Sequence, residues 1–300
     1  MVLSFLNRII KKSKWFYSYF PHCREYDRIC GDCDFICIGS SPAKYAIDFS
    51  KEVVKGANLA VVPETISYDY RILRNYHTCL RKDGYVLFVL CPFTFLKHKY
   101  TKEDNNNFYL NIRYYPILPK SEIESVNERL YQMWNNPVSM GLKVWAGIGR
   151  FSLRRNRGIE RVLDATEFDR DSEQRIRLWK NEFNLSDLAP SHINKDIIAA
   201  IQTNIETFKQ IKDFNEKNNH KSIIIIPPFS DNLTKLIPEK FVEYALLKPI
   251  GEIGIPFISY YGQSDWMKNE FYLNSFLLNK KGRYALTHDI VKRLNVINHK

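Results

Sequence analysis

Two runs of consecutive apolar residues constrain the fold of this chain more than any other feature. Tyr85–Cys91 is apolar throughout, and Ser222–Ile226 carries four consecutive isoleucines before the two prolines that end the run. A strand without polar alternation is covered on both faces, as strands in parallel sheets are. Shorter runs at residues 35–38, 58–62 and 255–260 are predicted to be further strands.

Helical patterns separate these runs. Apolar residues recur at steps of three and four over residues 193–219, and helices are also expected at 43–54, 64–80, 238–247 and 282–294. Strands that alternate with helices predict an α/β fold in three layers, with a doubly wound, mainly parallel sheet of about five strands. Open sheets of this type bind their ligands at the carboxyl ends of the strands.

We interpret the chain as one α/β domain over residues 1–300. Neither an internal repeat nor a linker indicates a second domain, and 300 residues can bury one large core. Residues 92–190 interrupt the alternation of strands and helices. We interpret them as an insertion that covers one side of the carboxyl edge of the sheet, with one helix at Ser121–Trp134.

Basic residues outnumber acidic ones by 44 to 33, which gives a formal net charge of +11. Such an excess favours nucleic acid, anionic glycans or an acidic membrane surface as partners. No arginine-rich nucleic-acid module, zinc-finger spacing or RNA-binding aromatic motif accompanies the charge. Nucleic acid is therefore disfavoured as a partner.

Five arginines crowd into twelve residues of the insertion: Arg150, Arg154, Arg155, Arg157 and Arg161. Such a run is typical of a solvated face. The same guanidinium groups could also bind a phosphate or a sugar acid, because their planar donors match two oxygens at once. Both interpretations stay open from the sequence.

Four of the six cysteines, Cys23, Cys30, Cys33 and Cys37, lie close together in the sequence. The spacing of Cys30 and Cys33 is one that metal and redox sites use, but no second cysteine pair or histidine partner follows at ligand spacing. We therefore expect free thiols in a reducing cytoplasm, with no metal and no other cofactor.

The first twenty residues mix large apolar side chains with Arg8, Lys11, Lys12 and Lys14. No run in the chain reaches the roughly 18 to 20 apolar residues of a membrane-spanning helix. The basic residues interrupt the apolar stretch and no small-residue cleavage site follows, so a secretory signal is not expected. Residues 1–20 are predicted to form an amphipathic helix that packs on its own domain, with an interfacial membrane helix as the alternative.

The strand expected at residues 35–38 leads directly into Gly39, Ser40 and Ser41. A buried strand that delivers small hydroxyl residues to its carboxyl end places them where α/β proteins carry their sites. Ser40 and Ser41 are therefore the first candidates for chemistry. The alternative is an ordinary strand-to-helix turn in which a serine caps the helix.

Three further motifs follow that turn in a fixed order. An Asn-Leu-Ala strand from Asn58 leads to Glu-Thr-x-Ser-Tyr-Asp-Tyr at residues 64–70, a later strand ends in Pro227-Pro228, and Asn-x-x-Leu-Leu-Asn-Lys-Lys-Gly-Arg occupies residues 274–283. Together the four motifs resemble the SGNH (GDSL-like) hydrolase superfamily, especially uncharacterised bacterial members associated with surface-polysaccharide loci. The resemblance covers residues 34–100 and 195–294.

This resemblance implies a flavodoxin-like sheet and a serine esterase or acyltransferase that acts on an acylated carbohydrate or an anionic glycan. It implies Ser41 as the nucleophile, and no cofactor. The positions that it implies for the oxyanion hole and the pocket are Gly39, Ser40, Glu64, Thr65 and Pro228.

The sequence departs from the family pattern at the catalytic base. Leu277 stands where the resemblance places the histidine, and Asn274 stands at the position of the aspartate. Leucine cannot accept a proton, so the serine lacks the base that would activate it. Glu64 and His288 are the replacement bases that the sequence offers. Two function classes remain: an esterase or acyltransferase with an impaired centre, and an inactive pseudoenzyme that binds a glycan or a partner.

Overall fold

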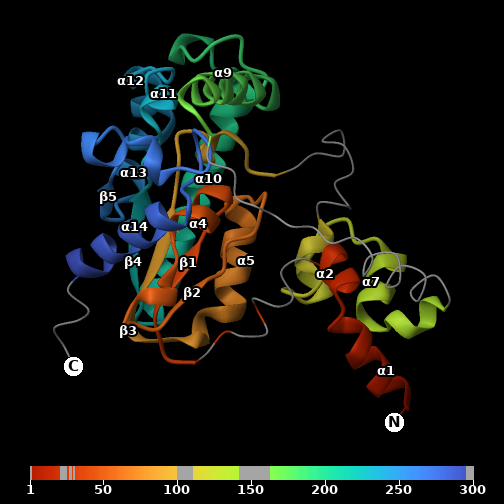
Figure 1. The fold of residues 1–300 in the computed structure, drawn as a ribbon. Helices are drawn as coiled ribbons and strands as arrows, with labels where there is room; N and C mark the ends of the chain where they lie inside the picture. Colours follow the sequence, from red (N-terminus) through yellow and green to blue (C-terminus); the bar gives the residue numbers. More distant parts are fainter. Residues whose placement is uncertain are drawn as a thin grey trace. The chain divides into compact units, whose positions relative to one another are not determined.

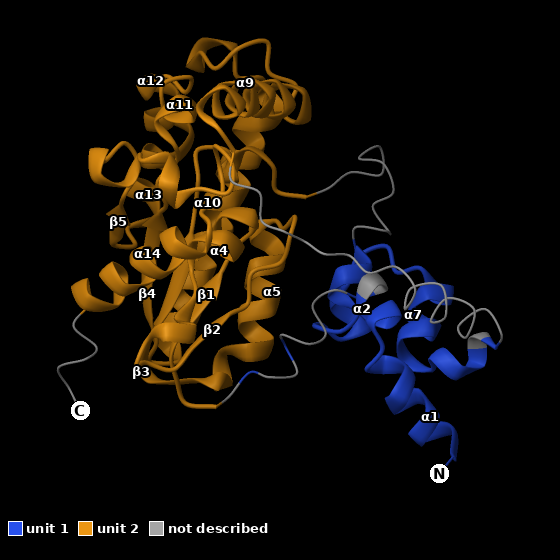
Figure 2. Ribbon diagram, viewed as in Figure 1, with its two compact units in different colours: residues 1–29, 100–159 blue, residues 30–99, 160–300 orange. Residues whose placement is uncertain are grey.

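The structure is a computed structural model that describes residues 2–20, 26, 29, 31–99, 111–141 and 163–294. The chain forms two compact units, residues 1–29 with 100–159 and residues 30–99 with 160–300 (Figure 2). This division differs from the single domain expected from the sequence. Much of the expected insertion clusters with the N-terminal segment, because aromatic side chains of the two segments pack together.

The larger unit contains a five-stranded sheet in which every neighbouring pair is parallel (Figure 1). The strands are β1 (Cys33–Ile38), β2 (Gly56–Asn58), β3 (Leu80–Val89), β4 (Lys221–Ile226) and β5 (Phe257–Ser259). Their order is β2-β1-β3-β4-β5. The chain adds β2 on one side of β1 and then crosses over to add β3, β4 and β5 on the other side. The predicted α/β class with a parallel sheet of this size is confirmed.

Both faces of the sheet are covered by helices. On one face, Cys37, Leu87 and Ile225 join a core cluster with residues of α4 (Ser41–Ala46) and α14 (Lys280–Arg293). On the other face, the Phe88 ring packs against Phe208, with ring centroids 5.4 Å apart. The helices that cover this second face are α5 (Ile66–Tyr76), α10 (Lys195–Lys217) and α13 (Lys248–Ile253). Burial on two sides explains why β3 and β4 carry uninterrupted apolar runs.

Two helical regions of this unit depart from the sequence-based expectation. Helix α9 (Ala165–Glu182) lies inside the stretch interpreted as an insertion, and a capping box of Asp164 and Glu167 begins it. The chain from Glu239 to Ile253 is helical in three parts: α12 (Glu239–Val242), the π-helical turn η8 (Glu243–Leu247) and α13. Pro249 has no N–H to donate within this stretch, and the π turn ends two residues before it, at Leu247. The short α11 (Asp231–Thr234) follows β4.

Strand β2 covers residues 56–58, whereas the strand was expected at residues 58–62, and the Asn58 side chain lies at its carboxyl end. Its Nδ2 donates to the carbonyls of Ala43 (3.0 Å) and Ile47 (2.9 Å), and its Oδ1 accepts from the N–H of Ala60 (3.0 Å). Beyond Asn58, the N–H groups of Leu59 and Val61 still donate to the carbonyls of Cys37 (2.8 Å) and Gly39 (3.2 Å). The same side chain also fixes α4 to the end of β2.

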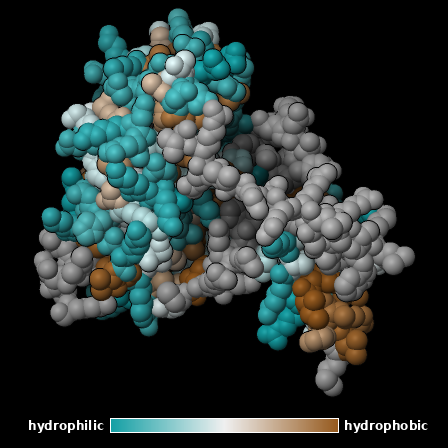
Figure 3. Space-filling model, viewed as in Figure 1, coloured by the Kyte–Doolittle hydropathy of each residue, from teal (hydrophilic) through white to brown (hydrophobic). Residues whose placement is uncertain are grey.

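The smaller unit contains α1 (Val2–Lys11), α2 (Lys14–Tyr19) and α7 (Glu128–Asn135). The ring centroids of Phe16 and Phe20 lie 5.5 and 5.3 Å from that of Trp134. The aromatic part of the N-terminal segment thus packs within its own unit, and the segment forms two helices where one was expected over residues 1–20. Figure 3 shows that α1, in contrast, carries an exposed apolar surface. Within the described ranges, no helix combines the length and the apolar character needed to cross a bilayer.

The Asp34 carboxylate holds together the amino ends of β1 and β3. It accepts hydrogen bonds from Arg81 Nε (2.7 Å) and from the N–H of Lys55 (2.9 Å), and Asp34 is only 4% exposed. We expect Asp34→Asn to lower the free energy of unfolding by about 1–3 kcal/mol, because a charge-assisted bond to a buried acceptor is lost. Urea denaturation measures this change.

The matched control is Asp231→Asn, which breaks the exposed pair of Asp231 with Lys235. That loss is expected to be below about 1 kcal/mol. Equal effects of the two substitutions would contradict a structural role for the Asp34 carboxylate.

Candidate functional site

The turn after β1 lies at the topological switch point of the sheet, between the carboxyl ends of β1 and β3. Gly39 has φ +134, and a Cβ there would lie 3.0 Å from both Ala43 Cβ and the Val89 carbonyl oxygen. Its own carbonyl accepts from the N–H of Val61 at 3.2 Å. Only glycine fits this backbone position, which brings the following serines close to β3.

Ser40 and Ser41 differ in their surroundings. Ser40 occupies the N-cap position of α4, but its side chain does not cap the helix. Instead, Ser40 Oγ accepts a hydrogen bond from the N–H of Glu64 at 3.1 Å. Ser41 begins α4 and is partly exposed, and its hydroxyl has no hydrogen-bonding partner among the described residues. The structure therefore ties Ser40 to the Glu64 segment and leaves Ser41 at the surface of the turn.

Two carboxyl groups lie buried beside this turn. Asp69 is 3% exposed, and burial raises the pKa of its carboxyl to about 7, while hydrogen bonds with the Glu64 side chain and the Gly39 N–H oppose that rise. Glu64 Oε2 also accepts from the N–H of Val61 at 3.2 Å. Two carboxylates in hydrogen-bond contact in an apolar site cannot both be ionised, so Glu64 and Asp69 share a proton.

Asp69 belongs to this site although the sequence alone did not indicate it. It lies in the Glu-Thr-x-Ser-Tyr-Asp-Tyr motif, five residues after Glu64, within the first turns of α5. An acidic residue near a helix N-terminus is usually a solvated partner of the helix dipole. Its burial against Gly39 depends on the packing of α5, which the motif itself does not reveal.

The Cys37 thiol faces the same region. It is fully buried, and burial together with the nearby charge of Asp69 raises its pKa. A protonated, inaccessible thiol is a poor nucleophile. Cys33, Cys79 and Cys91 are also free thiols. Among the described residues, no group of three metal-binding side chains lies together, and Cys23 and Cys30 fall outside the described part of the chain.

The start of α5 is linked to the segment after β3. Thr65 Oγ1 and Ser67 Oγ are 3.1 Å apart, and Ser67 Oγ donates to the His98 carbonyl at 3.4 Å. Thr65 is buried, so it serves as an internal link. His98 is thereby brought to the carboxyl edge of the sheet beside the Glu64 segment, a position that its distance in the sequence did not reveal.

The loop at residues 273–279 reaches the same edge through β4. The Ser230 N–H donates to the Ser275 carbonyl at 3.1 Å, just after Pro228 at the end of β4. Asn274 Oδ1 accepts from the N–H of Phe276 (3.0 Å) and of Leu277 (2.8 Å). The Asn274 side chain therefore stabilises the turn at residues 274–277.

The remaining sequence candidates lie elsewhere. His288 Nδ1 is 3.4 Å from Glu52 Oε2, beyond the C-terminal end of α4, whereas Ser41 begins that helix. The arginine cluster of residues 150–161 lies outside the described residues. The structure thus gathers Gly39, Ser40 and Glu64 at one place.

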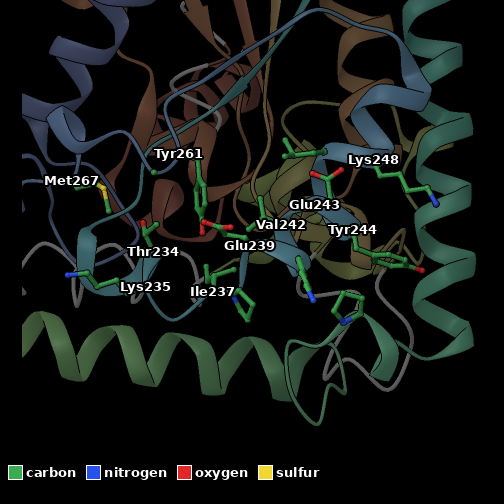
Figure 4. Close-up of a pocket in the computed structure, with 15 residues that line it drawn as sticks. Thr234, Lys235, Ile237, Glu239, Val242, Glu243, Tyr244, Lys248, Tyr261 and Met267 are labelled. Carbon is green, nitrogen blue, oxygen red and sulfur yellow. The ribbon is translucent and has the colours of Figure 1, made fainter.

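A separate cavity of about 1050 Å³ lies beside η8 (Figure 4). Tyr261, which follows β5, extends into it toward Glu239, and its buried hydroxyl has no hydrogen-bond partner in the described part of the chain. Burial, with smaller effects of Cys91 and Glu239, raises the pKa of Tyr261. The serines of the switch point do not line this cavity.

Comparison with known proteins finds no family model and no curated protein that matches this sequence. The function must therefore be argued from the fold and from the geometry of the switch point.

The shared proton predicts a characteristic dependence of stability on pH. Because the pKa of Asp69 is raised to about 7 in the folded state, the folded protein binds this proton more tightly than the unfolded chain does. The stability from Asp69 is present near pH 4 and is lost as the pH rises through about 7. Asp69→Asn should therefore be less destabilising at pH 8 than at pH 5 in urea unfolding.

The exposed Asp265→Asn serves as the control for that experiment, since the same substitution there should have a similar small effect at both pH values. A cost of Asp69→Asn that does not change between pH 5 and pH 8 would refute proton sharing at this site.

Gly39 offers a second test of the turn. Gly39→Ala should cost about 2–4 kcal/mol of stability, because it adds overpacking against Val89 to an unfavourable φ. Gly262→Ala is the matched control, with φ +73 and open space around the new Cβ. We expect it to cost about 1–2 kcal/mol from the backbone alone. Equal melting temperatures of the two variants would contradict a crowded turn at Gly39.

Proposed function

We propose that this chain is a divergent, serine-centred α/β protein of the SGNH type, with esterase or acyltransferase chemistry on acylated carbohydrate. In this proposal it acts in the cytoplasm, in connection with bacterial surface polysaccharide, and its catalytic centre is impaired. The observation that carries the proposal is the position of Ser40 and Ser41. They lie at the switch point, beside two carboxyl groups that share a proton.

The proposed chemistry is acyl transfer through a serine ester. A serine Oγ attacks the acyl carbonyl, its proton passes to a base, and the sugar hydroxyl leaves with a proton; water or another hydroxyl then takes the acyl group. The N–H of Glu64 donates to Ser40 Oγ and so favours the ionised form of that hydroxyl. A carboxyl group with a pKa of about 7 is suited to proton transfer near neutral pH.

Three features support an impaired centre. Leu277 stands at the position that the family resemblance assigns to the base, and no described side chain bonds to the Ser41 hydroxyl. The N–H of Gly39 is engaged by Asp69, which removes one donor from a possible oxyanion hole. Loss of a triad base leaves a residual acceleration of roughly 10³–10⁴ over water in the well-studied proteases.

A catalytically inactive binding protein is the second candidate function. The Gly39 N–H, which is engaged by Asp69, favours it, because that donor cannot then stabilise an oxyanion. The cavity beside Tyr261 offers such a protein a separate place for a ligand, with lysines and glutamates at its rim.

Hydrolysis of p-nitrophenyl acetate tests the two candidates. We expect the native chain to be weakly active, and either Ser41→Ala or Ser40→Ala to reduce kcat/KM at least tenfold, since each removes a hydroxyl of the proposed centre. Asn274→Asp with Leu277→His should raise the rate, because the aspartate can keep the bonds of Asn274 while the histidine supplies a base.

Ser264→Ala, at an exposed serine away from the turn, is the control and should leave the rate unchanged. If the native chain, both serine variants and the restored variant all hydrolyse the ester no faster than buffer, the enzyme proposal is wrong and the binding function is favoured.

A further inference from the structure

Helix α1 presents an apolar surface that its own unit does not cover. Val2, Leu3, Phe5 and Ile9 are 71%, 64%, 65% and 48% exposed. Of the nine exposed large apolar residues in the described part of the chain, these four belong to one ten-residue helix. The other five are spread over other elements. A concentrated apolar surface of this kind marks an interaction site, whereas scattered residues do not.

One side of the helix fixes its orientation on the unit. Asn7 Nδ2 donates to Asn136 Oδ1 (2.7 Å), and Asn7 Oδ1 accepts from the N–H of Val138 (3.0 Å). Ile10 is fully buried on this side. Val2, Phe5 and Ile9 recur at steps of three and four and therefore share a different, outward face.

Basic side chains lie along the helix next to that face. Arg8, Lys11 and Lys12 line an open cavity of about 750 Å³, together with Ser4, Asn7, Tyr17 and Asn135. No acidic residue lines the cavity, and residues 2–20 contain four basic residues and no acidic one. Lys11 Nζ also lies 4.4 Å from the centroid of the Trp134 ring, which holds this charge near the helix. The surface beside the apolar stripe is therefore strongly positive.

We propose that α1 is a docking helix for an anionic lipid bilayer, which it binds lying flat on the surface. Val2, Phe5 and Ile9 enter the boundary between headgroups and acyl chains, and Arg8 and Lys12 bind lipid phosphates at the level of the headgroups. Apolar burial and attraction to anionic lipid together drive the binding of such interfacial helices. The proposal concerns the smaller unit and does not depend on the chemistry of the switch point.

The charge argues for this partner over a second copy of the chain. A symmetric pair of α1 helices would bring the Arg8 and Lys12 groups of both copies together, and like charges at an interface oppose association. A polyanion without an apolar phase, such as a nucleic acid, would leave Phe5 and Ile9 in water. An anionic bilayer satisfies both the apolar stripe and the basic flank.

Sedimentation with vesicles tests the proposal. We expect the full chain to bind phosphatidylcholine vesicles that contain phosphatidylglycerol at least about tenfold more tightly than pure phosphatidylcholine vesicles, with binding weakened by salt. The triple variant Val2→Ser, Phe5→Ser, Ile9→Ser should lose binding to both kinds of vesicle. Its matched control is Val53→Ser, Ile198→Ser, Phe257→Ser, which removes the same three residue types from exposed positions of the other unit. The control should bind as the native chain does.

A second pair of variants tests the basic flank without altering the apolar stripe. Arg8→Gln with Lys12→Gln should reduce binding to anionic vesicles at least tenfold and leave binding to neutral vesicles unchanged. Arg177→Gln with Lys195→Gln, at exposed positions of α9 and α10, removes the same net charge and should have little effect. Far-UV circular dichroism verifies that each variant is folded, and this pair keeps the test decisive if the triple variant does not fold.

Two results would overturn the proposal. The first is equal loss of vesicle binding in the α1 variants and in their matched controls, which would indicate a general effect of charge or apolar surface. The second is self-association of the native chain in lipid-free buffer, seen by sedimentation velocity, that the α1 triple variant abolishes. That result would make α1 an interface between copies of the chain.

Discussion

Burial of the parallel sheet on both faces is the constraint on which the larger unit depends. Strands covered from two sides can carry few polar side chains, so polar groups collect at the strand ends and in the turns that follow. Phe88 packs on Phe208 from one side, while Leu87 belongs to the core cluster of the other. The position of the serines after β1 follows from this burial, because the switch point is where such a sheet can hold hydroxyl and carboxyl groups together.

Burial of the Glu64 and Asp69 carboxyl groups is the energetically unfavourable part of this arrangement. Removing two carboxyl groups from water is unfavourable, and sharing one proton reduces the penalty to that of a single charge, which the Gly39 N–H stabilises. The pair connects the turn after β1 to the start of α5. It therefore links the stability of the turn to pH, whether or not the neighbouring serines transfer an acyl group.

The strands and the main helices could be predicted because their apolar patterns are local. Several missed features depend on long-range contacts, such as the bonds of the Asn58 side chain to the carbonyls of Ala43 and Ile47. Helix α9 is different, because its capping box of Asp164 and Glu167 is a local signal in a stretch without strand alternation. Within the site, Ser40 was recognised from its place after a buried strand, whereas Asp69 and His98 come near it only through the packing of α5 and the segment after β3.

The fold class, the Gly39 turn at the end of a buried strand and the amphipathic character of the N-terminal segment were all predictable from local sequence patterns. Which of these groups meet, and in what charge state, depends on tertiary contacts. Burial of Asp69 against Gly39 sets its pKa, and the packing of Phe16 and Phe20 on Trp134 separates a buried α2 from an exposed α1. The physical reason is that solvation and proton affinity belong to the environment of a side chain, and folding creates that environment from residues far apart in the chain.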